Sequence, residues 1–164
     1  MVGPVMENLL LVILLFPLLG AGLNLLIGNK VGEKGIGWIA NAAIGFSFLT
    51  ALSLFILRGG CQKGLTFSLF EWFHFGNVNI PFSFYLDGLS GVFVLIITGI
   101  GSLIHLFSIG YMHGDKEIKR YFIYLNLFIF FMLTLVMASN YLLMFVGWEG
   151  VGLCSYLLIG FWYQ

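Results

Sequence analysis

One acidic residue, Glu149, lies in the middle of the last long apolar stretch of the sequence. Between Tyr141 and Tyr163 no other residue ionises near neutral pH. In a helix that rises about 1.5 Å per residue, Glu149 would lie roughly 12 Å from Tyr141, near the middle of a bilayer core about 30 Å thick. Because carboxyls at that depth are costly and usually mark ion or proton pathways, we interpret Glu149 as a proton-transfer group. The alternative is a buried carboxyl that only holds helices together.

Three glycines, Gly147, Gly150 and Gly152, surround this carboxyl in the sequence. Small residues in a membrane helix allow another backbone, or water, to come close. They could therefore serve an approaching partner of the acid, or tight helix packing alone. Ser155 and Tyr156 follow one to two turns later, and we expect them to form hydrogen bonds within the bundle rather than to act in catalysis.

A second titratable residue, His105, lies in an earlier apolar stretch. The polar or small residues on one helical face of that stretch are Asp87, Gly91, Thr98, Ser102 and His105. We expect this face to look into the bundle, where His105 could relay protons, since histidine changes charge near physiological pH. The alternative is a hydrogen-bonded helix contact. Asp87, three residues before Ser90, is interpreted as a helix N-cap rather than as the outer mouth of a proton path.

The composition indicates a protein that crosses a membrane several times. The chain has 164 residues, of which 60 % are hydrophobic and 9 % charged, and its mean hydropathy is +1.05. Soluble domains do not have such a composition. The net charge is zero and no basic run suggests nucleic acid. We find no metal-ligand spacing, nucleophile–base pair or nucleotide motif, and therefore predict no metal, no cofactor and no redox chemistry in this chain.

The predicted fold is a single all-α membrane region over residues 1–164. Each apolar segment must be helical, because a single span in lipid has to satisfy its own backbone hydrogen bonds. The five predicted helices cover about residues 6–27, 36–57, 85–109, 118–138 and 141–163.

Alternating apolar and polar residues before residue 85 predict a β-hairpin over about residues 65–84, with Gly76 and Asn77 in its turn. The hairpin could be a docking edge for a neighbouring subunit, or a flap packed on its own helices. Five basic residues in the first and third connections, against two in the second, favour a cytoplasmic location for the first and third. The N-terminus would then lie outside and the C-terminus in the cytoplasm.

Four stretches carry a resemblance to a known family. They are the residues from Phe84 to Ser90, Gly110 to Asp115, Tyr124 to Met132 and Asn140 to Tyr163. Together they resemble the L subunit of bacterial NADH:quinone oxidoreductase, respiratory complex I, which is chain 5 in mitochondria. The most specific part is the run Gly-Trp-Glu-Gly-Val-Gly-Leu-Cys-Ser-Tyr around Glu149. The large subunit of multi-subunit sodium/proton antiporters shares the general pattern, and a non-transporting membrane scaffold is a further alternative.

The resemblance implies that Glu149 is a proton-pumping carboxyl paired with a lysine on a broken seventh helix. A nearby ammonium favours the carboxylate and its withdrawal favours the neutral acid, so one charge shift would move one proton. It also implies that the outer hairpin touches an adjacent antiporter-like subunit in a bacterial inner membrane. This subunit would hold no cofactor, while the whole complex would use FMN, iron–sulfur clusters, NADH and quinone.

The family's subunit continues through many more helices, arranged as two inverted five-helix repeats. By the resemblance, this sequence holds three peripheral helices and two helices of the first repeat. The lysine partner is absent from it. We therefore expect a fragment, a truncated chain or a split gene product.

Overall fold

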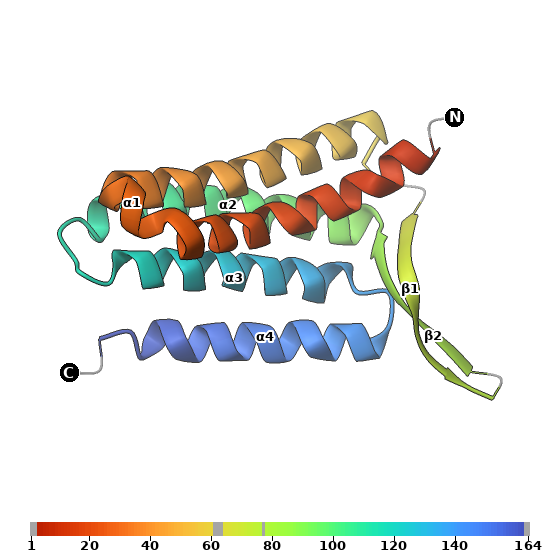
Figure 1. Cartoon of the computed structure of the whole chain (residues 1–164). Helices are drawn as coiled ribbons and strands as arrows, with labels where there is room; N and C mark the ends of the chain where they lie inside the picture. The colour runs from red at the N-terminus through yellow and green to blue at the C-terminus, as the bar shows by residue number, and fades with distance from the viewer. Residues whose placement is uncertain (1–2, 61–63, 77, 163–164) are drawn as a thin grey trace.

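The computed structural model describes residues 3–60, 64–76 and 78–162. Its elements follow the order α1 (Gly3–Leu57), β1 (Leu65–Phe75), β2 (Val78–Leu86), α2 (Gly88–Tyr111), α3 (Ile118–Met137) and α4 (Tyr141–Ile159). The helices lie roughly side by side, and the two strands form a hairpin at one end of the bundle (Figure 1). Four helices of the described part are long and apolar enough to cross a membrane.

The first helix folds back on itself at Gly32. This residue has φ 71° and ψ 174°, outside the helical region, and it divides the 55 residues of α1 into a first arm (3–31) and a second arm (33–57). The arms pack against each other, and the hydroxyl of Ser47 donates a hydrogen bond of 2.6 Å to the carbonyl oxygen of Ile13. The structure has four labelled helices, and the two arms of α1 correspond to the predicted helices over residues 6–27 and 36–57. Helical backbone continues through the predicted connection at residues 28–35, because one glycine with positive φ suffices for the reversal.

The hairpin is a two-stranded antiparallel sheet. Leu65 pairs with Leu86 at its base and Phe75 with Val78 at its tip. Gly76 has φ 58°, as its predicted place in the turn requires, and Asn77 lies outside the described residues. Strand pairing continues to Leu86, so Tyr85 and Leu86 belong to the sheet, although the sequence predicted that they begin the next helix. Helix α2 therefore starts at Gly88 instead of residue 85.

The hairpin base is tied to the turn between α3 and α4. The backbone N–H of Ser139 donates to the carbonyl oxygen of Ser83 at 3.2 Å, and the hydroxyls of these two serines are also hydrogen-bonded. The side-chain amide of Asn140 donates to the carbonyl oxygen of Pro81 at 2.8 Å. The strand, the turn and the first residue before α4 therefore form one hydrogen-bonded unit.

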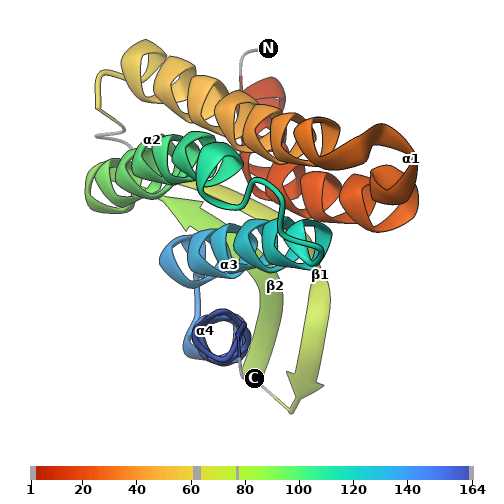
Figure 2. The same cartoon turned by 90° about the vertical axis from the view of Figure 1, so that its left-hand side faces the viewer.

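Helix α3 lies at the centre of the bundle. It packs against α1 and α2 on one side and against α4 on the other. The end-on view shows α4 at the edge of the assembly, below α3 (Figure 2). One buried cluster fills the hairpin end of the bundle and includes Leu54, Phe84 and Leu133. A second cluster at the opposite end includes Met112 and Phe122.

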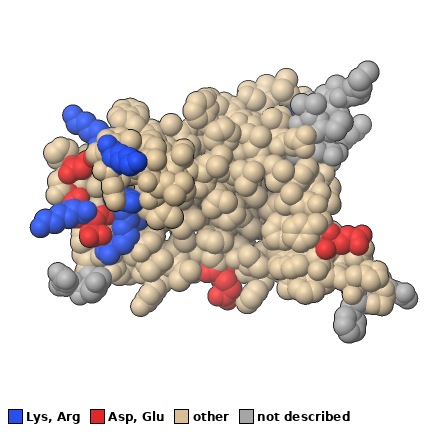
Figure 3. All heavy atoms as spheres, in the orientation of Figure 1, with Lys and Arg blue, Asp and Glu red and all other residues tan. Residues whose placement is uncertain are grey.

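Charged side chains gather at the end of the bundle opposite the hairpin (Figure 3). This charged end is formed by the reversal of α1, the connection between α2 and α3, and the first turn of α3. Glu33 accepts a hydrogen bond of 3.1 Å from the backbone N–H of Gly114, which joins two of these segments. Its basic residues are Lys30, Lys34, Lys116, Lys119 and Arg120. Between the charged end and the hairpin, this face shows acidic atoms only over α4 at the lower edge.

Candidate functional site

The helix that carries Glu149 has a defined start. Asn140 has extended backbone angles, and its side-chain oxygen accepts a hydrogen bond of 3.0 Å from the N–H of Leu143. Asn140 is therefore an N-cap, and it satisfies one of the free N–H groups at the start of a helix. The helix ends at Ile159, four residues before the predicted end at Tyr163, which lies outside the described residues.

One side of α4 packs tightly against α3. Its buried residues are Leu143, Gly147, Gly150 and Cys154. A Cβ added at Gly147 would lie 2.6 Å from the backbone N and Cα atoms of Leu135, and one added at Gly150 would meet the Phe131 ring. These two glycines therefore allow close approach between α4 and α3.

Glu149 lies on the other side of α4. At about 100° per residue it is roughly 200° around the helix from Gly147, so its side chain leads away from α3. The residue is exposed, as are Trp148 and Tyr156 near it. Gly152 shares this side, and apart from its chain neighbours and its own helix backbone, no heavy atom of the described chain lies within 4 Å of the position that a Cβ would occupy there. The described residues thus leave the side of α4 around Glu149 uncovered, which we call the open face of α4. Among the described residues of this chain, none covers the carboxyl of Glu149.

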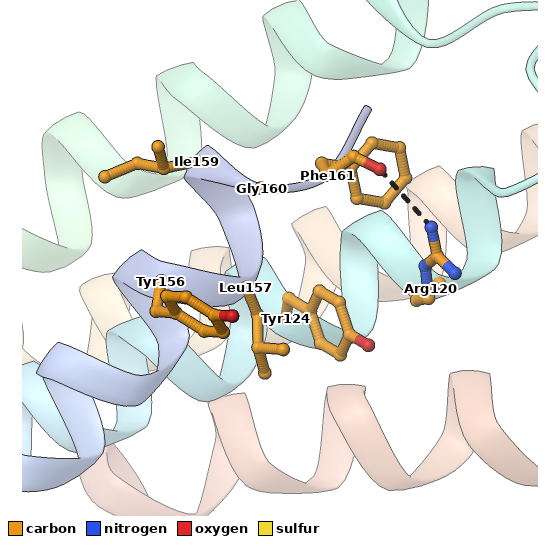
Figure 4. Close-up of a pocket in the computed structure, with 7 residues that line it drawn as sticks. All are labelled: Arg120, Tyr124, Tyr156, Leu157, Ile159, Gly160 and Phe161. Carbon is orange, nitrogen blue, oxygen red and sulfur yellow. Dashed lines mark hydrogen bonds between the residues drawn. The ribbon is translucent and has the colours of Figure 1, made fainter. Parts of the chain in front are cut away.

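The open face leads to a hollow of about 420 Å³ between the end of α4 and the start of α3 (Figure 4). Tyr156 lines this hollow, two turns from Glu149 on the same side of α4. The guanidinium of Arg120 donates to the carbonyl oxygen of Phe161 at 3.4 Å and lies over the Phe161 ring at 4.9 Å. The remaining predicted residue of this helix, Ser155, is half-buried.

His105 is fully buried in α2, as its predicted place on an inward face requires. Its Nδ1 lies 2.8 Å from the carbonyl oxygen of Gly101, one turn earlier. The inward face of α2 also buries Gly91 and Thr98. Glu149 points away from α3 on the far side of the bundle, so the structure does not bring the two candidate proton-transfer residues together.

Asp87 forms a capping box with Ser90 at the start of α2. Its carboxylate accepts a hydrogen bond of 2.8 Å from the backbone N–H of Ser90, and the Ser90 hydroxyl accepts one of 2.8 Å from the backbone N–H of Asp87. The backbone and hydroxyl hydrogen bonds from Ser90 lower the pKa of Asp87 below its ordinary value. The cap that we preferred to a proton entry point is therefore present.

Sequence reasoning missed three buried asparagines, Asn24, Asn41 and Asn126. Asn24 and Asn126 are fully buried, and the side-chain oxygen of Asn41 is buried although the residue is only partly so. A signal was available, because a polar side chain inside an apolar membrane segment usually faces the bundle interior. Within residues 3–60, 64–76 and 78–162, no group of three or more His, Cys, Asp or Glu side chains could hold a metal ion.

Two family models match the sequence. Residues 72–122 match "NADH-Ubiquinone oxidoreductase (complex I), chain 5 N-terminus". Residues 138–164, which include α4, match "NADH:quinone oxidoreductase/Mrp antiporter, TM".

Similar full-length proteins come from bacteria and from an animal. NADH-quinone oxidoreductase subunit L of Rickettsia typhi is 40 % identical over 158 residues, covering 96 % of this chain and 24 % of that protein. The subunit L of Mycobacterium tuberculosis is 45 % identical over 151 residues, covering 90 % of this chain and 24 % of that protein. NADH-ubiquinone oxidoreductase chain 5 of Metridium senile is 41 % identical over 157 residues, covering 93 % and 25 %.

The chain therefore spans about a quarter of the length of the curated relatives that it matches. Its apolar helices and these matches are those of a multi-pass membrane protein. The sequence belongs to the family of NADH-quinone oxidoreductase subunit L and chain 5.

Proposed function

We propose that this chain is part of a proton-translocating membrane subunit of an NADH:quinone oxidoreductase, in which Glu149 takes up and releases the proton. The observation that carries the proposal is the position of this carboxyl. It is the one acidic residue of α4, lies near the middle of that helix, and stands on the open face. The relatives are about four times as long as this chain, so the remainder of such a protein would supply the cover for that face.

The chemistry at Glu149 follows from what would cover it. Once enclosed in a medium of low dielectric, a carboxyl without a cationic neighbour favours its neutral form, and one beside an ammonium favours its ionised form. Moving the ammonium towards or away from Glu149 would therefore release or bind one proton. By the family resemblance that cation is a lysine beyond this sequence. Oxidation of NADH and reduction of quinone, with FMN and iron–sulfur clusters, would take place in other subunits.

The hairpin and the charged end support an arrangement in the membrane. Phe67 and Trp72 of the hairpin pack on the core of the bundle, whereas Phe70 and Phe73 are exposed. We propose that the exposed aromatic side chains contact a neighbouring membrane-arm subunit, in particular an adjacent antiporter-like one, on the outer side of the membrane. The basic residues of the charged end would then face the cytoplasm, in keeping with the positive-inside rule.

The test is Glu149→Gln in the full-length protein within the assembled complex. We expect proton transport driven by NADH to fall strongly at equal amounts of assembled complex, because the amide cannot bind and release a proton. Glu149→Asp should retain part of the transport, since it keeps an acid at the same position. Glu117→Gln, at an exposed position of the charged end, is the matched control and should transport protons normally.

If Glu149→Gln complexes assemble poorly, but those that do assemble transport protons normally, this acid only ties helices together, as in a scaffold.

The description of the second family model, which names Mrp antiporters, favours one further candidate function, that of a sodium/proton antiporter subunit. Neighbouring genes for redox subunits or for antiporter subunits distinguish the two. His105 remains a second candidate for proton relay, and an unchanged transport rate and proton-to-electron ratio after replacement by glutamine would exclude it.

A further inference from the structure

A group of buried polar side chains lies inside the bundle on the side of α3 away from Glu149. It consists of Asn41 from the second arm of α1, His105 from α2 and Asn126 from α3. The atoms without a hydrogen-bond partner among the described residues are Nε2 of His105, Oδ1 of Asn41 and both amide atoms of Asn126. Such atoms are rare in folded proteins, because a buried polar atom left unpaired loses its hydrogen bond to water without a replacement.

The packing of α1 on α2 places Asn41 level with His105. A Cβ at Gly37 would lie 2.7 Å from Cγ1 of Ile109, so these two residues face each other across the interface. The second arm of α1 and α2 run in opposite directions (Figure 1). Asn41 lies one turn after Gly37, and His105 lies one turn before Ile109, so both steps lead to the same level of the bundle.

The third helix brings Asn126 to the same place. The His105 ring lies 6.1 Å, centre to centre, from the Phe122 ring of α3, and Asn126 follows Phe122 by one turn on the same helical face. The side-chain amide of Asn126 neighbours the His105 ring. Both amide atoms also lie 3.3 Å from the position that a Cβ would occupy at Gly20 in the first arm of α1, so a glycine makes room for this amide.

The balance of donors and acceptors shows what is missing. A backbone carbonyl only accepts, so the contact of 2.8 Å between His105 Nδ1 and the Gly101 oxygen places a proton on Nδ1. In the neutral ring Nε2 is then an acceptor. Three acceptor atoms, on His105, Asn41 and Asn126, therefore face only the two N–H donors of the Asn126 NH₂ group. Exchanging the oxygen and nitrogen of the Asn126 amide leaves this balance unchanged, and the Asn126 amide cannot donate to its own oxygen.

We propose that His105, Asn41 and Asn126 form an internal water-binding site between α1, α2 and α3. A water molecule supplies two O–H donors and still accepts from an N–H, which is the combination that the side chains lack. Asn24 lies one turn after Gly20, towards the charged end, and extends the site in that direction. Its Oδ1 also has no hydrogen-bond partner among the residues described. In the same direction, Ser108 and Tyr121 form a hydrogen bond of 3.1 Å one turn from His105.

Hydroxyl-radical footprinting of the full-length protein in lipid nanodiscs tests this proposal, because radiolysis generates radicals from water next to a side chain. Phe122 and Phe84 are a matched pair, both almost fully buried phenylalanines. We expect Phe122, beside the site, to be oxidised and Phe84, in the apolar cluster at the hairpin end, to be protected. Protection of Phe122 equal to that of Phe84 would overturn the proposal.

Asn126→Leu is the second arm of the experiment. It removes the NH₂ group and fills its volume with an apolar side chain, so oxidation of Phe122 should fall to the level of Phe84. Unchanged oxidation of Phe122 in this variant would contradict the site. If the variant does not fold, density maps of the unaltered complex that resolve ordered water decide the matter, since a peak within hydrogen-bond distance of His105 Nε2 is required. The transport assay of Glu149→Gln is independent of both results.

Discussion

Replacing Gly147 by alanine tests the tight contact between α3 and α4. The added Cβ would lie 2.6 Å from N and Cα of Leu135 and 2.9 Å from its Cβ. Carbon atoms in favourable contact are about 3.5–4.0 Å apart, so the two helices must separate locally by about 1 Å. Two of the three neighbouring atoms belong to the backbone of a helix and cannot rotate away. Overpacking of this kind costs about 1–3 kcal/mol.

Gly152→Ala is the matched control for this experiment. It makes the same chemical change on the same helix, but at a position where no heavy atom of the described chain is within 4 Å. Alanine favours a helix over glycine by about 1 kcal/mol in water, and this gain applies to both variants. The difference between them therefore isolates the clash with Leu135.

Unfolding of this chain of 164 residues by SDS titration in mixed micelles measures that difference, because the open face of α4 at Gly152 stays uncovered in it. We expect the free energy of unfolding of Gly147→Ala to lie about 1–3 kcal/mol below that of Gly152→Ala. Gly150→Ala should fall between them, because the atoms that it meets belong to the Phe131 ring, which is only half-buried and can move. Equal stabilities of the Gly147 and Gly152 variants would refute the inference that backbone contact sets the distance between α3 and α4.

Two further predictions concern the helix caps. Because the hydrogen bonds from Ser90 lower the pKa of Asp87, the ionised carboxylate stabilises the fold above the ordinary carboxyl pKa, and this contribution is lost as the pH falls through the lowered pKa. Ser90→Ala should raise the pKa of Asp87 towards its ordinary value in an NMR titration, and an unmoved value would contradict the capping box. Asn140→Ala removes the cap of α4 and the bond to Pro81, and we expect a loss of about 1–2 kcal/mol and faster hydrogen exchange in the first turn of α4. Asn79→Ala on the exposed part of the hairpin is the control. If hydrogen exchange in the first turn of α4 is as fast in this control as in Asn140→Ala, the role of the cap is disproved.

Much of the fold could be predicted from the sequence because local signals and burial agree there. The apolar runs mark the membrane helices, and Asp87 marks a helix start that the structure confirms. The strand alternation predicted the hairpin, but it continues through Tyr85 and Leu86, whose apolar character also suits a helix. Only the cross-strand pairs Thr66–Tyr85 and Leu65–Leu86 decide between the two, and such pairing cannot be deduced from one segment alone.

The surroundings of the candidate site could not be predicted in the same way. Which side of α4 meets α3 depends on the partner helix, and α4 is apolar on nearly all sides, so periodicity gives no direction. Gly147 and Gly152 look alike in the sequence, yet one touches a backbone and the other touches nothing described. The buried asparagines carry no motif, and their importance follows only from the unpaired atoms that the packing leaves beside His105.

The hydrogen bonds that join the hairpin to the turn before α4 have a mechanical consequence. Strand β2 holds that turn through Ser139 and Asn140, and α4 begins at the next residue. A load applied to the exposed tip of the hairpin would therefore reach the helix of Glu149 through these hydrogen bonds and the main chain of the turn. An inhibitor or antibody fragment that immobilises the hairpin would restrain this helix at a distance, without approaching the acid.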